Sequence, residues 1–87
     1  MKKPPANARA ELFAAIEKGE LPLRDAVRAM RKSIGLTQTE YAELIGIAPR
    51  IVIDLERGVG NPTLASLLKI GKPFGLELAF VRRKASG

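Results

Sequence analysis

The clearest structural signature in this 87-residue chain lies in residues 35–58, which read GLTQTEYAELIGIAPRIVIDLERG. The segment predicts two short helices, residues 37–45 and 49–57, joined by a three-residue turn that contains a glycine. Thr37 followed by Glu40 has the spacing of a capping box, which marks the start of the first helix. The second helix opens on a proline, whose fixed φ suits a first helical turn, and a glycine follows its last residue.

Two short helices joined by a tight turn are the outline of a helix-turn-helix. The residues make this outline more specific. Residues 35–47 closely resemble the first half of the phage-repressor/Cro type of helix-turn-helix, and DLERG at residues 54–58 with NPT at residues 61–63 resembles its second half. The resemblance covers about residues 23–75. It implies an all-α, lambda-repressor-like bundle of five helices, in which the second motif helix lies in the major groove of DNA.

Apolar periodicity predicts three further helices, at residues 8–18, 22–34 and 64–72. Asn7 is expected to cap the first of them, and Pro73 to end or bend the last. Leu44 is expected to face inward from the first motif helix, and Leu23, Leu64 and Leu68 belong to the apolar stripes of the flanking helices. The chain is expected to consist of a flexible basic arm (1–7), a helical DNA-binding domain (8–75), and a C-terminal strand with a basic tail (76–87).

The composition narrows the classes of function. The chain contains no cysteine and no histidine. This excludes disulfides, thiolate nucleophiles and cysteine-ligated zinc, and it removes the commonest metal ligand and neutral-pH proton-transfer group. The sequence also shows no paired carboxylates, no metal-ligand spacing and no phosphate-cradling glycine loop. We therefore expect no enzymatic activity, no metal site and no cofactor.

The charge balance indicates a polyanionic partner. The chain has 15 Lys and Arg against 9 Asp and Glu, a formal net charge of +6, which suits double-stranded DNA. Residues 36–58 contain two arginines against four carboxylates, so nonspecific attraction must come from the flanking segments. No apolar run approaches the ~18–20 residues that span a bilayer, and no apolar stretch follows the basic start. A cytoplasmic, DNA-associated protein without membrane contact is expected.

The second motif helix has one face that is expected to read DNA. Val52 and Leu55 are expected to face the core, and at about 100° per residue Arg50, Asp54 and their neighbours then point outward. The resemblance implies base contacts from Pro49, Arg50, Ile53 and Asp54. Arg50 is the strongest of these, since a guanidinium can bridge guanine O6 and N7. The family usually has polar residues at several of these positions, so a solvated or protein-binding face remains the alternative.

The resemblance also implies phosphate contacts and one structural pair. The phosphate contacts are Thr37, Gln38, Arg57, Asn61 and Thr63. Helix starts favour an anion through their amide N–H groups and the helix dipole, although both threonines could be caps alone. Arg31 and Glu56 match a family pair that links the helix at residues 22–34 to the recognition helix. We expect their side chains to meet within ion-pair distance and to be partly shielded; otherwise they are two unrelated surface charges.

Residues 76–81, LELAFV, have the pattern of a β-strand. A lone strand leaves its N–H and C=O groups unpaired, and no other stretch of the chain is a convincing strand. We expect the same strand of a second copy to pair with it across a two-fold axis, with Leu76, Leu78 and Phe80 on one face. The alternative is an extended tail packed on its own domain.

Together these features predict a sequence-specific double-stranded DNA-binding transcriptional regulator. A repressor that acts as a homodimer on a palindromic operator fits best. The chain could also be the antitoxin of a toxin–antitoxin operon, with a cognate toxin as partner. The alternative from another class is a protein-interaction module on the same fold with weak or no DNA binding.

Overall fold

The computed structural model describes residues 6–82. The expected basic arm and the end of the basic tail lie largely outside these residues. The described part contains five α-helices, as expected, followed by a single 3₁₀ turn. They are α1 (Ala8–Glu17), α2 (Leu23–Ser33), α3 (Gln38–Ile45), α4 (Pro49–Glu56), α5 (Leu64–Gly71) and the 3₁₀ turn Lys72–Phe74.

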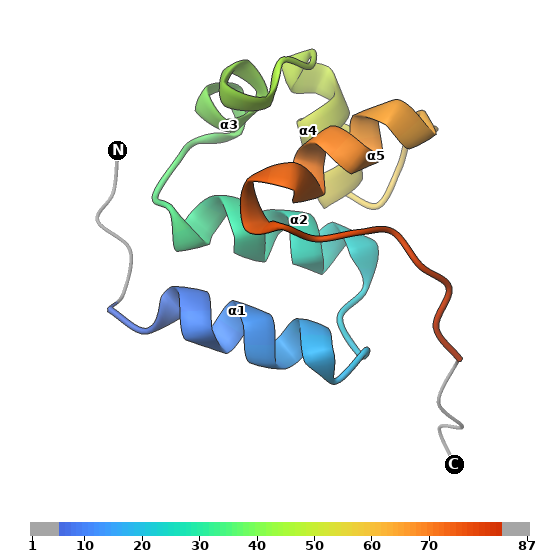
Figure 1. Ribbon diagram of the computed structural model, residues 1–87. Helices are drawn as coiled ribbons and strands as arrows, with labels where there is room; N and C mark the ends of the chain where they lie inside the picture. Colours follow the sequence, from blue (N-terminus) through green and yellow to red (C-terminus); the bar gives the residue numbers. More distant parts are fainter. Residues whose placement is uncertain (1–5, 83–87) are drawn as a thin grey trace.

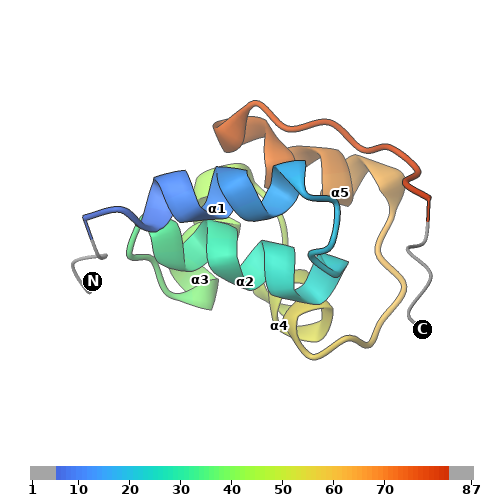
Figure 2. The ribbon, with the colours of Figure 1, turned by 90° about the horizontal axis from the view of Figure 1, so that it is seen from below.

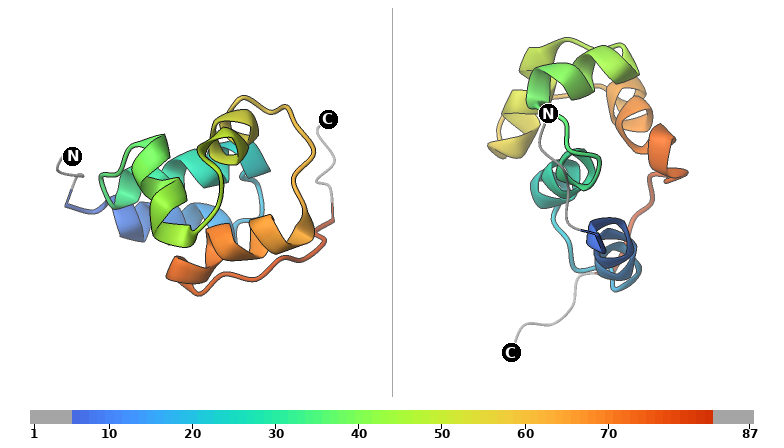
Figure 3. Two further views of the ribbon diagram at one scale, coloured as in Figure 1. Left: turned by 90° about the horizontal axis from the view of Figure 1, so that it is seen from above. Right: turned by 90° about the vertical axis from the view of Figure 1, so that its left-hand side faces the viewer.

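The helices pack around α2. Figure 1 shows α2 between α1 on one side and the α3–α4 pair on the other, with α5 alongside. The right-hand view of Figure 3 shows the same order from the side, with α1 and the α3–α4 pair on opposite sides of α2. Contacts join α2 to both α1 and α4, and α3 to α4. Of the two motif helices, α4 therefore rests directly on α2, and α3 is positioned through its contacts with α4.

The helix ends follow their local chemistry. Both halves of the capping box are formed at α3, where the Thr37 hydroxyl accepts from the Glu40 N–H and the Glu40 carboxylate accepts from the Thr37 N–H. Gly46 ends α3 in the left-handed conformation that glycine adopts at little cost. Asn7 differs from expectation, because its side-chain amide donates to the Glu11 carboxylate instead of capping α1.

Nine apolar side chains form the core: Leu12, Val27, Met30, Tyr41, Ala42, Val52, Leu55, Ile70 and Phe74. Tyr41 is fully buried, and its hydroxyl donates to the Ile70 carbonyl oxygen, which ties α3 to α5. Burial raises the pKa of the Tyr41 hydroxyl to about 12, so it remains a hydrogen-bond donor at all physiological pH values. The core thus contacts the buried sides of α3 and α4 and fixes the position of the helix pair.

Some leucines of the helical pattern are exposed. Leu44 is 60% exposed because the inward face of α3 is set by Tyr41, Ala42 and Ile45, and Leu44 lies about 110° around the helix from the centre of that face. The expectation that Leu44 faces the core is therefore wrong. The side chains of Leu23, Leu64 and Leu68 are also largely exposed, at 46%, 65% and 47%.

The C-terminal segment does not form the expected strand in the single chain. Residues 76–82 are extended without ladder pairing, and the part of the chain that the structure describes contains no β-strand. The segment runs alongside the helical bundle (Figure 2) and contributes to an apolar cavity of about 260 Å³ between the end of α1, the start of α2, and α5. A strand needs a neighbour to pair with its backbone groups, and residues 6–82 of one copy contain no second strand. Leu76 packs against the core, whereas Phe80 is fully exposed.

Candidate nucleic-acid interface

The hairpin of α3 and α4 is held together by its turn. Ala42 is completely buried, and its carbonyl oxygen accepts from the N–H groups of both Gly46 and Ile47, at 2.9 and 3.0 Å. A small side chain at this position lets the two helices approach each other closely. Pro49 then opens α4, and Ala48, which precedes it, supplies no side-chain cap. The start of α4 is therefore left accessible.

α4 has one buried and one open side. Val52 is fully buried and Leu55 nearly so, as expected for the side that contacts the core. Pro49 and Arg50 are exposed, Ile53 and Asp54 are half-buried, and Arg57, at the end of the helix, is exposed. The Arg50 side chain retains 71% of its accessible surface. The four residues expected to contact bases thus lie on the side of α4 that the protein leaves open.

Arg50 and Asp54 form an ion pair one helical turn apart. The distance between Arg50 Nε and Asp54 Oδ1 is 3.7 Å, and the Asp54 side chain is 28% exposed. Gly60, in the loop after α4, lies directly against Asp54, since a Cβ atom at position 60 would be 3.0 Å from the Asp54 Cβ. The loop after α4 therefore covers part of Asp54 and leaves Arg50 open.

The residues expected to bind phosphate lie at three helix ends and a loop. Thr37 caps α3 from an exposed position, and Arg57 ends α4. Thr63 caps α5, where its hydroxyl accepts from the Ser66 N–H at 3.1 Å. Asn61 is exposed in the loop between α4 and α5 and lines a small cavity together with Asp54. The Thr37 hydroxyl accepts from a backbone N–H, so its own O–H can donate to solvent or to an anion, whereas the Thr63 hydroxyl donates to Ser66 Oγ at 3.1 Å.

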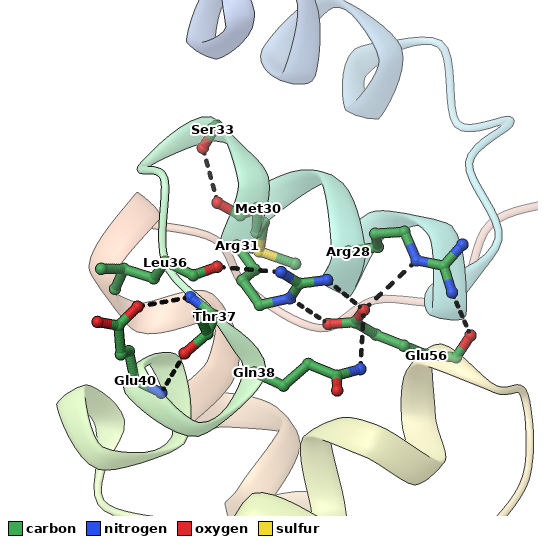
Figure 4. Close-up of polar contacts among 9 residues, drawn as sticks. All are labelled: Arg28, Met30, Arg31, Ser33, Leu36, Thr37, Gln38, Glu40 and Glu56. Atoms are coloured by element: carbon green, nitrogen blue, oxygen red, sulfur yellow. Dashed lines mark hydrogen bonds and ion pairs between the residues drawn. The ribbon is translucent and has the colours of Figure 1, made fainter. Parts of the chain in front are cut away.

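Glu56 is the centre of a polar cluster that joins three helices (Figure 4). Its carboxylate accepts two hydrogen bonds of 2.7 Å from the Arg31 guanidinium, one from Nε and one from Nη2. Arg28 Nε and the Gln38 side-chain amide also donate to Glu56 Oε1, at 3.4 and 3.3 Å. Arg28 Nη2 further donates to the Glu56 carbonyl oxygen at the end of α4. The Glu56 side chain is 1% exposed and that of Arg31 is 13% exposed, so the pair is well shielded from solvent.

The cluster contains more than the pair that the sequence suggested. Arg28 lies three residues before Arg31 on α2, hence on the same side of that helix, and this spacing was the available signal. Gln38 was expected at a phosphate, but in the protein alone its amide group donates to Glu56. Arg31 also donates to the Leu36 carbonyl oxygen, which fixes the connection between α2 and α3.

The electrostatics of the cluster favour its charged form. Burial alone would raise the pKa of the Glu56 carboxyl, but the hydrogen bonds and charge of Arg31, together with Gln38 and Arg28, outweigh burial and hold the pKa below its ordinary value of 4.5. The hydrogen bond to Glu56 in turn raises the pKa of the Arg31 guanidinium. The cluster is therefore ionised at neutral pH, and it fixes the end of α4 against α2 and α3.

The comparison with known proteins agrees with this geometry. Two short helices joined by a glycine turn, one side of the second packed inward and the other open, define a helix-turn-helix protein. The family model described as Helix-turn-helix matches residues 27–81, well over half of the chain. The chain belongs to this Cro/C1-type helix-turn-helix family of transcriptional regulators.

Several relatives are named uncharacterized HTH-type transcriptional regulators. The one from Methanothermobacter thermautotrophicus is 38% identical over 55 residues, which are 63% of this chain and 80% of that protein. One from Archaeoglobus fulgidus is 32% identical over 56 residues, covering 64% of this chain and 80% of that protein. One from Haemophilus influenzae is 33% identical over 51 residues, covering 59% of this chain and 52% of that protein. No solved structure is significantly similar to the chain.

None of the helices in residues 6–82 combines the length and the apolar character that a bilayer crossing requires.

Proposed function

We propose that this protein regulates transcription by binding double-stranded DNA in a sequence-specific manner, with α4 as the recognition helix. One observation carries the proposal: α4 is locked on its Val52–Leu55 side, while Arg50 on its other side is 71% exposed. A rigid helix with an accessible guanidinium in its first turn is suited to the major groove, where arginine bridges guanine O6 and N7. Within this proposal the side of α4 that faces the bases carries Pro49, Arg50, Ile53 and Asp54.

The proposed phosphate contacts surround this helix. They are Thr37, Gln38, Arg57, Asn61 and Thr63. Contacts of this kind fix the orientation of a protein on the duplex without reading its sequence. Gln38 is held by Glu56 in the free protein, so contact with a phosphate would require its amide to turn away from that carboxylate.

Positive charge near α4 comes from α2. The Arg28 guanidinium donates to the Glu56 carbonyl oxygen at the end of α4. The Arg24 side chain packs over Gly58, where a Cβ atom would lie 3.2 Å from the Arg24 Cδ. Both arginines are exposed. They compensate for the carboxylates of the motif and supply charge that can displace counterions from DNA.

A salt titration tests the proposal. The affinity for a random-sequence duplex of about 30 base pairs would be measured by fluorescence anisotropy at several salt concentrations. If the protein or its dimer neutralises ~6–10 phosphates, the affinity falls by about 10³-fold or more between ~50 and ~200 mM salt. The absence of binding at the lowest salt concentration would contradict the proposal.

The proposed active form is a homodimer. Extended residues 76–82 have no ladder partner within the described chain, and Leu78, Phe80 and Val81 are exposed. Antiparallel pairing of two such segments would satisfy their backbone groups and cover Leu76, Leu78 and Phe80. Two recognition helices about 34 Å apart would then read a palindrome with half-sites one helical turn apart.

Repression is the mode of action that needs no additional domain or partner protein, because a dimer bound at a promoter blocks the access of RNA polymerase. A narrower form of the proposal makes the chain the antitoxin of a toxin–antitoxin operon. The small domain, the helix α1 before the motif and the extended C-terminal segment are compatible with that role. Co-expression with the product of the adjacent reading frame, followed by co-purification and a growth assay, tests it.

A second candidate function is supported by the exposed leucines. Leu44, Leu64 and Leu68 are 60%, 65% and 47% exposed, which suits a protein-binding module on the same fold. The salt titration separates the two candidates, since a protein-binding module without DNA affinity shows no binding to the duplex at any salt concentration.

A further inference from the structure

Arg50 and Asp54 face each other on the open side of α4, but their surroundings differ. The Arg50 side chain is 71% exposed, whereas that of Asp54 is only 28% exposed. The nitrogen of Arg50 closest to the carboxylate is Nε, at 3.7 Å from Oδ1. A guanidinium that turns its Nε toward a carboxylate keeps its two terminal nitrogens available, and these are the donors that bridge guanine O6 and N7.

The position of Asp54 is fixed by the loop after α4. Its carbonyl oxygen accepts from the N–H groups of Val59 and Arg57, at 2.9 and 3.2 Å, so the chain folds back at this point. Gly60 has a φ of +91° and approaches so closely that a Cβ atom there would lie 3.0 Å from the Asp54 Cβ and 3.6 Å from its Oδ2. Both the positive φ and the close approach require glycine. The backbone of the loop therefore limits where the Asp54 carboxylate can go.

We propose that Asp54 is a positioning residue that orients Arg50 for base recognition, and that it makes no base contact of its own. This inference rests on the proposed function and assigns a role to one residue on the DNA-facing side of α4. A long arginine side chain loses considerable rotamer freedom when it is ordered at a base. A fixed carboxylate one helical turn away restricts that freedom before binding. The same negative charge lies close to the DNA backbone and weakens binding to duplexes that offer Arg50 no guanine.

The test uses the full chain and a duplex selected from a randomised pool by the wild-type protein. Asp54→Asn keeps the size of the side chain and its contact with Gly60 but removes the charge. It should bind a scrambled duplex more tightly and lower the preference for the guanine read by Arg50 by about threefold to tenfold, a part of what one base contact contributes. Glu43→Gln is the matched control, because Glu43 is an exposed carboxylate on α3 and its loss changes the net charge equally. It should leave the base preference unchanged.

A double-mutant cycle separates positioning from direct contact. If Asp54 acts through Arg50, then adding Asp54→Asn to Arg50→Ala changes the preference at that base pair no further. If Asp54 contacts its own base, Asp54→Asn alters the preference at a different base pair and the two effects add, which overturns the inference but leaves the proposed function intact. A wild-type protein with no salt-dependent duplex binding overturns both. Circular dichroism and thermal unfolding confirm that each variant is folded.

Discussion

At the level of single residues, Glu56 shows how one buried carboxylate orders the proposed DNA-binding surface. It lies at the end of the helix that carries Arg50, and its oxygen atoms accept hydrogen bonds from α2 and α3. Its pair with Arg31 is almost free of solvent, with side-chain exposures of 1% and 13%. Such a pair makes a specific geometry costly to break, although it is weak evidence for net stabilisation of the fold.

Glu56→Gln should destabilise the protein by about 2–4 kcal/mol, because the substitution leaves the shielded Arg31 guanidinium without its counter-charge. The free energy of unfolding would be measured by urea denaturation at pH 7. Glu43→Gln, which removes an exposed carboxylate, serves as the control and should change stability by less than about 0.5 kcal/mol. Equal effects of the two substitutions would show that the cluster does not hold α4 in place.

The lowered pKa of Glu56 predicts a specific pH dependence. A carboxyl group whose pKa is lower in the folded than in the unfolded state contributes stability that is complete above the unfolded value. For Glu56 this contribution is present at neutral pH and is lost as the pH falls below about 4.5 and through the folded-state value. The stability difference between the wild type and Glu56→Gln should therefore shrink between about pH 5 and pH 3. A difference that stays constant over this range would argue against a charged Glu56.

At the level of secondary structure, the two motif helices can be predicted from the sequence. Which side chains of α3 are buried can be predicted only in part. The capping box at Thr37 and the glycine at residue 46 are local signals, and local chemistry determined both ends of α3. Leu44 was misplaced because an eight-residue helix has too few turns to define its inward face. The contacts of α3 with α4 and α5 define the inward face of the helix, and a single sequence does not reveal these contacts.

Thr37→Ala should cost about 1 kcal/mol of stability, since it removes the side-chain acceptor for the Glu40 N–H at the start of α3. Thermal unfolding followed by circular dichroism measures the effect as a lower Tm. Thr39→Ala, two residues along on the exposed side of the same helix, is the matched control and should be neutral or slightly stabilising. If both variants unfold at the same temperature, the cap contributes nothing to the hairpin.

At the level of the whole molecule, the pairing of the C-terminal segment depends on more than the sequence and the structure of one chain. The periodicity of residues 76–81 predicts a strand, and one copy of the chain leaves the segment extended with Phe80 fully exposed. Pairing between chains depends on a second molecule, so neither the periodicity nor the packing of one chain determines it. The Arg31–Glu56 contact followed from the sequence resemblance, whereas the participation of Arg28 and Gln38 required the three-dimensional arrangement.

Phe80→Ala should weaken self-association while leaving the monomer folded, because Phe80 makes little contact within its own chain. A central aromatic residue in a dimer interface contributes about 2 kcal/mol or more, which corresponds to an increase of about thirtyfold in the dimer Kd. Analytical ultracentrifugation over a range of protein concentrations measures this constant. Leu44→Ala, an exposed apolar residue on α3, should leave the constant unchanged. A wild-type protein that stays monomeric at high concentration would contradict the homodimer.

The most direct test of the recognition helix is methylation interference on a duplex selected from a randomised pool. A methyl group on guanine N7 projects into the major groove, where Arg50 is proposed to bind. Methylation of one guanine in each half-site should block binding of the wild-type protein, and the same methylation should have little effect on the weaker binding of Arg50→Ala. Interference at the same guanines with equal strength in both proteins, or no interference at any guanine N7, would show that Arg50 does not read the major groove.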